Sequence, residues 1–244
     1  MAASIISIEL IMRVREFYTM AYQEISSDKR KQVMPDNGIT DYAIPSYILS
    51  VAAVEAFVNE SFLALGTRFL KGSSFEKLSD EEIKEFREKK SLRNKLIQLP
   101  KLAFDQEVFN SSQQPFQDMN YLIKVRDSFV HYKMAIEPEY EGIHDYLVMK
   151  GVARKSPNDP NRFWAQDLCT FEGIRWAHNT ALVIIKNIID TAIETNRHPI
   201  LIQMRKQSKN FFDQIPEPHK DQERWLAWLK FHCKWAKIDK PKVS

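Results

Sequence analysis

Glycine is scarce in this sequence, which has 6 glycines in 244 residues, whereas average usage would give about 17. β-Sandwiches, β-barrels and dinucleotide-binding folds use glycine at tight turns and phosphate loops. The sequence also contains no G-x-G-x-x-G string and no G-K-[ST] string. These absences disfavour nucleotide-binding α/β enzymes and glycine-rich β folds, and they favour a helical protein.

Cysteines and long apolar runs are also lacking. The two cysteines, Cys169 and Cys233, match no C-x-x-C spacing, so we expect unpaired thiols in a reducing compartment. The longest apolar run, residues 47–58, is interrupted by Glu55, and residues 1–12 contain no basic side chain. We therefore expect a cytoplasmic protein with no signal peptide and no membrane segment.

Helical periodicity is what the sequence has in abundance. Apolar side chains recur every three or four residues along residues 5–25, 45–69, 115–135 and 171–196, and this spacing predicts four helices. Ser79 and Glu82 stand at the spacing of a capping box, which predicts a charged helix from there to Leu99. Pro100 is expected to end that helix.

The stretch over residues 137–166 has little helical periodicity. Residues 146–152 and 163–164 are expected to form short strands there. The predicted fold class is therefore all-α, an up-and-down bundle of four to five long helices in residues 1–200, with a small irregular or β-hairpin insertion.

Residues 201–244 form a basic, tryptophan-rich C-terminal extension. The whole chain has a net charge of only +3, but this segment holds ten Lys or Arg against five Asp or Glu. Aromatic and basic residues alternate on one predicted amphipathic helix, notably Trp225, Trp228, Lys230, Lys234 and Trp235. The aromatic side of this helix either packs on the bundle or on a dimer mate, which we favour, or binds RNA by stacking and phosphate contacts.

Few residues in the sequence suggest catalysis. No two histidines stand at metal-ligand spacing, and no motif marks a serine or cysteine nucleophile, so we expect no metal and no cofactor. Arg126 projects from the apolar side of its predicted helix, where an arginine needs a partner. Glu55 is the obvious candidate, because it too interrupts an apolar helix.

His131 follows Arg126 by five residues. This spacing corresponds to about 140° around a helix axis and about 7.5 Å along it. The two side chains therefore do not converge from one straight helix. Two copies of the helix, packed across a two-fold axis, would bring them into one cleft.

The string from Arg126 to His131, with the polar Asp127 after the arginine, resembles the R-x-x-x-x-H motif of the HEPN superfamily. Residues 47–65, with Glu55, look like the glutamate-bearing early helix of that superfamily. The resemblance covers residues 44–70 and 115–196, about half of the chain. HEPN proteins are four-helix bundles that dimerise, and many are metal-independent endoribonucleases of toxin–antitoxin, antiphage or RNA-processing systems, whereas others are inactive.

The resemblance implies that Arg126 and His131 are the catalytic pair of an endoribonuclease. An imidazole can take the proton of a ribose 2′-hydroxyl or donate one to the leaving 5′-oxygen. A guanidinium can hold the phosphate as negative charge grows on it. The expected product is a 2′,3′-cyclic phosphate, and DNA should not be cleaved.

Further residues receive supporting roles from the same resemblance. Glu55 would orient the arginine, Asp127 and Tyr132 would assist at the site, and Lys133 would contact RNA. The toxin branch of the superfamily has a tyrosine two residues after the histidine, but here Tyr132 follows directly and Lys133 takes that place. The implied partners are RNA, a second copy of the chain, and an antitoxin or defence-system protein.

A second class of function fits the same residues. In this alternative the chain is a non-catalytic helical dimerisation or interaction module, and Arg126 and Glu55 form a structural ion pair. Exposure of Arg126 and His131 favours the enzyme, whereas a fully buried and paired Arg126 favours the module.

Overall fold

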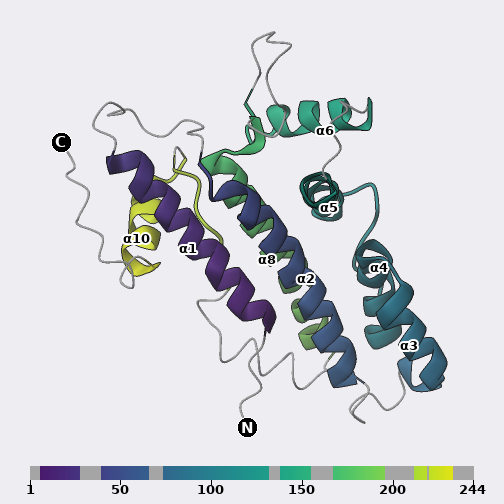
Figure 1. The fold of residues 1–244 in the computed structure, drawn as a ribbon. Coiled ribbons are helices and arrows are strands. Elements are labelled where there is room, and N and C mark those ends of the chain that lie inside the picture. The colour runs from purple at the N-terminus through teal and green to yellow at the C-terminus, as the bar shows by residue number, and fades with distance from the viewer. Residues whose placement is uncertain are drawn as a thin grey trace. The chain divides into compact units, whose positions relative to one another are not determined.

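The computed structural model describes residues 6–27, 40–65, 74–131, 138–154, 167–195, 212–218 and 220–232. Within these ranges the chain is all-α and contains no β-strand (Figure 1). The predicted all-α class is confirmed. The elements are α1 (Ile6–Ser27), α2 (Ala43–Leu65), the short 3-10 helix η1 (Ser74–Lys77), α3 (Asp80–Lys89), α4 (Leu92–Phe104), α5 (Phe116–Val130), α6 (Pro138–Met149), α8 (Phe171–Glu194) and α10 (Gln222–His232).

The chain divides into two compact units. Unit 1 comprises Met1–Leu10, Val51–Lys124 and Thr180–Asp213, and unit 2 comprises Ile11–Ser50, Val125–Asn179 and Gln214–Ser244. The helices α1, α2, α5 and α8 contribute residues to both units. The predicted domain boundary at residue 200 lies outside the described residues, and the up-and-down bundle of the HEPN type stays a prediction.

The core of unit 1 is built around aromatic rings. Phe62 of α2 is 1% exposed and stacks on Phe86 of α3, with ring centroids 4.0 Å apart. Phe75 of η1 meets Phe62 edge to face at 4.8 Å. Beside them the ammonium of Lys95 is buried, and it donates hydrogen bonds to Asn59 Oδ1 at 3.1 Å and to the Arg87 carbonyl at 2.8 Å. The lysine thereby satisfies a carbonyl in the last turn of α3.

The core of unit 2 is centred on Tyr47 of α2. Its ring stacks on Phe129 of α5 and meets Trp176 of α8 edge to face, and its hydroxyl donates a 2.8 Å hydrogen bond to the Leu168 carbonyl. Gly173 allows this close packing, because a Cβ atom at that position would lie 2.1 Å from the Tyr47 hydroxyl oxygen. One aromatic side chain thus joins three helices.

The charged helix predicted over residues 79–99 is two helices. The capping box at its start is confirmed, because the Glu82 amide donates to Ser79 Oγ at 3.2 Å and the Ser79 amide donates to the Glu82 carboxylate at 2.8 Å. The first helix ends at Lys89, and Ser91 caps a second. Pro100 does not end α4, because it lies inside the helix, just before the last turn, and the helix instead closes at Asp105, whose φ of 55° is left-handed. The predicted single helix is therefore interrupted at Ser91, whose side chain caps the start of α4.

The strand expected over residues 146–152 is wrong, because α6 runs to Met149 and residues 150–152 form a turn. Pro138 stands at the first helical position, where its fixed φ and missing N–H are tolerated. Ile143 and Leu147, four residues apart, are buried, and Gly151 follows the helix with a left-handed φ of 70°. One apolar pair is too short a pattern to predict a helix. The second expected strand, residues 163–164, lies outside the described residues.

The other four helix predictions are confirmed within the described ranges, with ends that differ by a few residues. Their buried residues follow the apolar periodicity, such as Ile174, Ala177 and Ala181 in α8. None of the helices in the described part of the chain combines the length and apolarity needed to cross a bilayer.

Candidate functional site

The end of α5 carries the residues that the sequence singled out. Met119, Leu122 and Val125 of α5 are fully buried, and they set which side of the helix faces the protein interior. Arg126 follows them, and its side chain is 25% exposed. It is therefore neither fully buried nor fully solvated.

Among the described residues of unit 2, the carboxylate beside Arg126 is that of its neighbour, Asp127. The Arg126 Nε atom lies 2.7 Å from Asp127 Oδ1, yet this buried nitrogen has no hydrogen-bond partner. The contact is an ion pair by distance, but the N–H is not directed at the oxygen. Because the Asp127 side chain is 48% exposed, solvent weakens the pair.

His131 is the first residue after α5 and is exposed. Its backbone N–H donates to the Asp127 carbonyl at 2.9 Å, which continues the helical hydrogen-bond pattern by one residue. Its imidazole makes no hydrogen bond or ion pair to any residue that the structure describes. Arg126 and His131 thus lie at the same end of α5, both in unit 2.

The remaining residues predicted for this site are not brought together by the described structure. Glu55 lies in the part of α2 that belongs to unit 1 and is half-buried, so its pairing with Arg126 stays a prediction. Tyr132 and Lys133 lie outside the described residues.

The tryptophans of the C-terminal helix are core residues of unit 2. Trp225 is 2% exposed and Trp228 is 7% exposed. The Trp225 indole N–H donates to the hydroxyl of Tyr18 of α1 at 2.9 Å, and the Trp228 ring meets the same tyrosine edge to face at 5.8 Å. These contacts match the packing interpretation of the extension, and they leave neither ring open for base stacking.

The rest of the predicted RNA-binding surface is not described. The side chain of Lys230 in α10 lies outside the described part of the chain, as do Lys234 and Trp235.

A buried polar network in unit 2 was missed by sequence reasoning. Arg15 of α1 is 2% exposed, and its Nε–H donates to Nε2 of the fully buried His178 of α8 at 3.0 Å. Burial, and then the charge of Arg15, hold the pKa of His178 well below its ordinary value of 6.5. Burial and Arg15 also lower the pKa of His232, at the end of α10, to about 4. The only sequence signal was an ionisable residue beside the apolar stripe of each helix.

Two other titratable groups in unit 2 are perturbed. Burial, and then the charge of Glu172, raise the pKa of the Tyr18 phenol well above 10.0. Burial, and then the charge of Asp41, raise the pKa of the free Cys169 thiol to about 11. Cys169 is therefore a neutral thiol at physiological pH and not an activated nucleophile. Cys233 lies outside the described residues.

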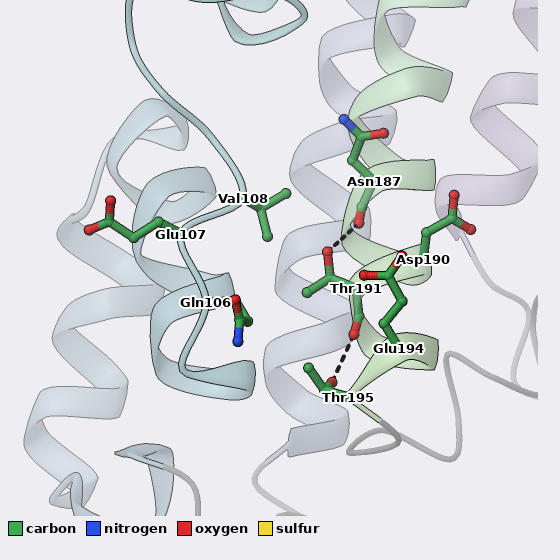
Figure 2. Close-up of a pocket in the computed structure, with 8 residues that line it drawn as sticks. All are labelled: Gln106, Glu107, Val108, Asn187, Asp190, Thr191, Glu194 and Thr195. Carbon is green, nitrogen blue, oxygen red and sulfur yellow. Dashed lines mark hydrogen bonds between the residues drawn. The ribbon is translucent and has the colours of Figure 1, made fainter.

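Unit 1 contains a polar pocket of about 600 Å³. It is lined by the loop residues after α4 and by one side of α8: Gln106, Glu107, Val108, Asn187, Asp190, Thr191, Glu194 and Thr195 (Figure 2). Thr191 and Thr195 donate their hydroxyl hydrogens to helix carbonyls at 2.8 Å, so only their lone pairs remain for a ligand.

Two of the three carboxylates that line this pocket pair with lysines, Glu107 with Lys101 and Asp190 with Lys186. Val108 projects toward α8, whereas Glu107 projects from the other side of the loop (Figure 2). Hydrogen bonding to Lys101, and then its charge, lower the pKa of Glu107.

No group of three or more His, Cys, Asp or Glu side chains that could hold a metal ion occurs in the described ranges. Comparisons with protein-family models, with curated proteins and with solved structures found no match to this chain.

Proposed function

We propose that this chain is a metal-independent endoribonuclease of the HEPN type, with Arg126 and His131 as its catalytic residues. The observation that carries the proposal is the solvent exposure of these two side chains at the end of α5. The guanidinium is partly open to solvent beside a half-exposed carboxylate, and the imidazole is exposed. A buried structural ion pair would instead enclose the arginine.

The chemistry requires only these two groups. The neutral imidazole of His131 takes the proton of a ribose 2′-hydroxyl, and the oxygen attacks the adjacent phosphorus. The bond from phosphorus to the 5′-oxygen breaks, the imidazolium formed on His131 returns its proton to the leaving oxygen, and a 2′,3′-cyclic phosphate remains. Arg126 holds the phosphate while negative charge accumulates. The phosphate must displace the weak contact with Asp127.

The spacing of Arg126 and His131 on one helix leads us to include a homodimer in the proposal. A two-fold axis near the end of α5 would place the arginine of one copy beside the histidine of the other. Light scattering at micromolar concentration should give about twice 28.6 kDa. A strict monomer that still cleaves RNA would rule out the composite site.

The direct test is incubation of the purified protein with total RNA in EDTA. Wild-type protein should produce 2′,3′-cyclic phosphate ends, and His131→Ala and Arg126→Ala should abolish cleavage. Arg126→Lys should be poor, because an ammonium cannot replace the planar fork. Arg93→Ala is the matched control, since Arg93 is an exposed arginine of α4, and it should cleave like wild type.

The thermal midpoint separates chemistry from folding. His131→Ala should leave it nearly unchanged, because an exposed imidazole contributes little to the core. Equal cleavage by wild type and His131→Ala would refute the site assignment. If wild type cleaves none of the RNA offered, the interaction-module alternative gains support, and a search for a protein partner such as an antitoxin replaces the activity assay.

A further inference from the structure

The network around His178 fixes which of its nitrogens carries the proton. Nε2 accepts the hydrogen bond from Arg15, so Nε2 is unprotonated. The hydrogen therefore resides on Nδ1, which donates to Asn179 Oδ1 at 3.0 Å. A second proton would have to sit on Nε2, which would then be a donor pointing at the Nε–H donor of the buried Arg15 cation. Protonation of His178 and its hydrogen bond with Arg15 are mutually exclusive.

Asn179 connects this histidine to the chain that leads into α10. Its Nδ2 donates to the Ile215 carbonyl at 2.8 Å, and its Oδ1 accepts from the Ile215 N–H at 2.8 Å. The same Oδ1 atom therefore receives hydrogen bonds from His178 and from Ile215. Since Ile215 is 1% exposed, water does not replace these bonds while the segment is docked.

The other end of the docked segment also carries an imidazole. The His232 ring lies on Trp228, with centroids 4.2 Å apart, and Trp228 packs on Tyr18 of α1. Arg15 acts on both imidazoles, and His232 acts on His178. In each case a positive charge lowers the pKa of the imidazole.

Two further charged groups among the described residues act on Tyr18 in this region. Glu172 and Arg175 of α8, which act on Tyr18, form an ion pair with each other at 2.6 Å. Arg224 of α10 is exposed. No described carboxylate acts on either imidazole to stabilise a proton there.

We propose that Arg15, His178 and His232 form an acid-sensitive latch within unit 2, which holds residues 214–218 and α10 against residues 11–27 of α1 and 171–179 of α8. Protonation of His178 breaks its hydrogen bond with Arg15 and places a second positive charge beside a buried one. Protonation of the half-buried His232 adds a further positive charge nearby, and the C-terminal segment is thereby released. The released segment exposes the rings of Trp225, Trp228 and Tyr18. This latch operates whether or not the chain cleaves RNA.

The pH range of release follows from the direction of the pKa shifts. Solvated imidazoles in the released state titrate near 6.5, and docked ones titrate lower. The latch is therefore fully stable above pH 6.5, and its stability falls as the pH drops below that value. Each proton taken up on release lowers the docking equilibrium constant by about tenfold per pH unit, so two protons lower it by about a hundredfold.

Hydrogen exchange of the full chain between pH 7.5 and pH 4.5, corrected for intrinsic rates, tests the latch. The amides of residues 222–232 and of Ile215 should lose protection first, while residues 11–24 and 171–179 keep theirs. The double variant His178→Gln and His232→Gln retains acceptors but cannot titrate, and its α10 amides should stay protected over the same range. Simultaneous loss of protection in α10, α1 and α8, or wild-type behaviour of the double variant, would overturn the proposal.

An NMR titration of wild-type protein keeps the test decisive if the double variant does not fold. The His178 and His232 imidazole resonances should titrate together with the loss of α10 protection. A His178 pKa at or above 6.5 in the docked state would refute the latch.

Discussion

The hydrogen bond between Tyr18 and Trp225 allows a quantitative test of how α10 docks. Tyr18 is fully buried and Trp225 is 2% exposed, and the indole N–H donates to the phenol oxygen at 2.9 Å. Tyr18→Phe leaves a buried N–H without an acceptor, which costs about 1–3 kcal/mol. Trp225→Phe leaves the phenol without its donor and also removes packed ring volume, so its cost is larger.

The two substitutions should not be additive. In the double variant neither polar group remains, so the penalty for unpaired groups disappears, and the measured loss should be smaller than the sum of the single losses by about 1–3 kcal/mol. Urea unfolding followed by far-UV circular dichroism gives the three free energies, because this signal does not depend on the tryptophan that is replaced.

Trp228 supplies the matched control for this cycle. Its ring meets Tyr18 edge to face, but its buried indole nitrogen has no hydrogen-bond partner. The cycle of Tyr18→Phe with Trp228→Phe should therefore be additive to within about 0.5 kcal/mol. Additivity in the Trp225 cycle as well would refute the docked position of α10.

Four further substitutions, one of them a control, test the packing of each unit by urea unfolding. Gly173→Ala should destabilise unit 2 by several kcal/mol or prevent folding, because the new Cβ would overlap the Tyr47 hydroxyl. Gly142→Ala in α6 is the control: its Cβ meets no atom within 4 Å, so it should stabilise by about 0.5–1 kcal/mol. Equal effects of the two substitutions would contradict the packing of unit 2. Ser79→Ala removes the cap of α3 and should cost about 1 kcal/mol, so an unchanged midpoint would show that the cap contributes nothing. Lys95→Met keeps the buried stem but leaves two acceptors unpaired, and it should cost about 1–3 kcal/mol; a stabilised variant would contradict that pairing.

The sequence predicted the elements whose causes are local. The three-and-four spacing of apolar residues is enough to place α1, α2, α5 and α8, because a helix must bury one face. The capping box at Ser79 was likewise readable, since its hydrogen bonds span three residues. The split at Ser91 and the helix α6 are also local, but their signals are one cap and one apolar pair, too weak to outweigh the surrounding pattern.

The contacts that define unit 2 were decided by the tertiary structure. Arg15 meets His178 from 163 residues away, and Tyr18 meets Trp225 from 207 residues away. No local pattern encodes such pairs, because the positions of both partners depend on how separate helices dock. The sequence could state only that an arginine or tryptophan in an apolar stripe needs a partner.

The same distinction applies to the candidate site. Residue type and spacing were enough to select Arg126 and His131, because a guanidinium and an imidazole suit phosphate chemistry wherever they stand. Whether the arginine is enclosed or open depends on what packs around the end of α5, and that is a property of the folded chain. Among the described residues of unit 2, the carboxylate that lies beside Arg126 is that of its half-exposed neighbour Asp127, whereas the apolar pattern predicted a partner on another helix.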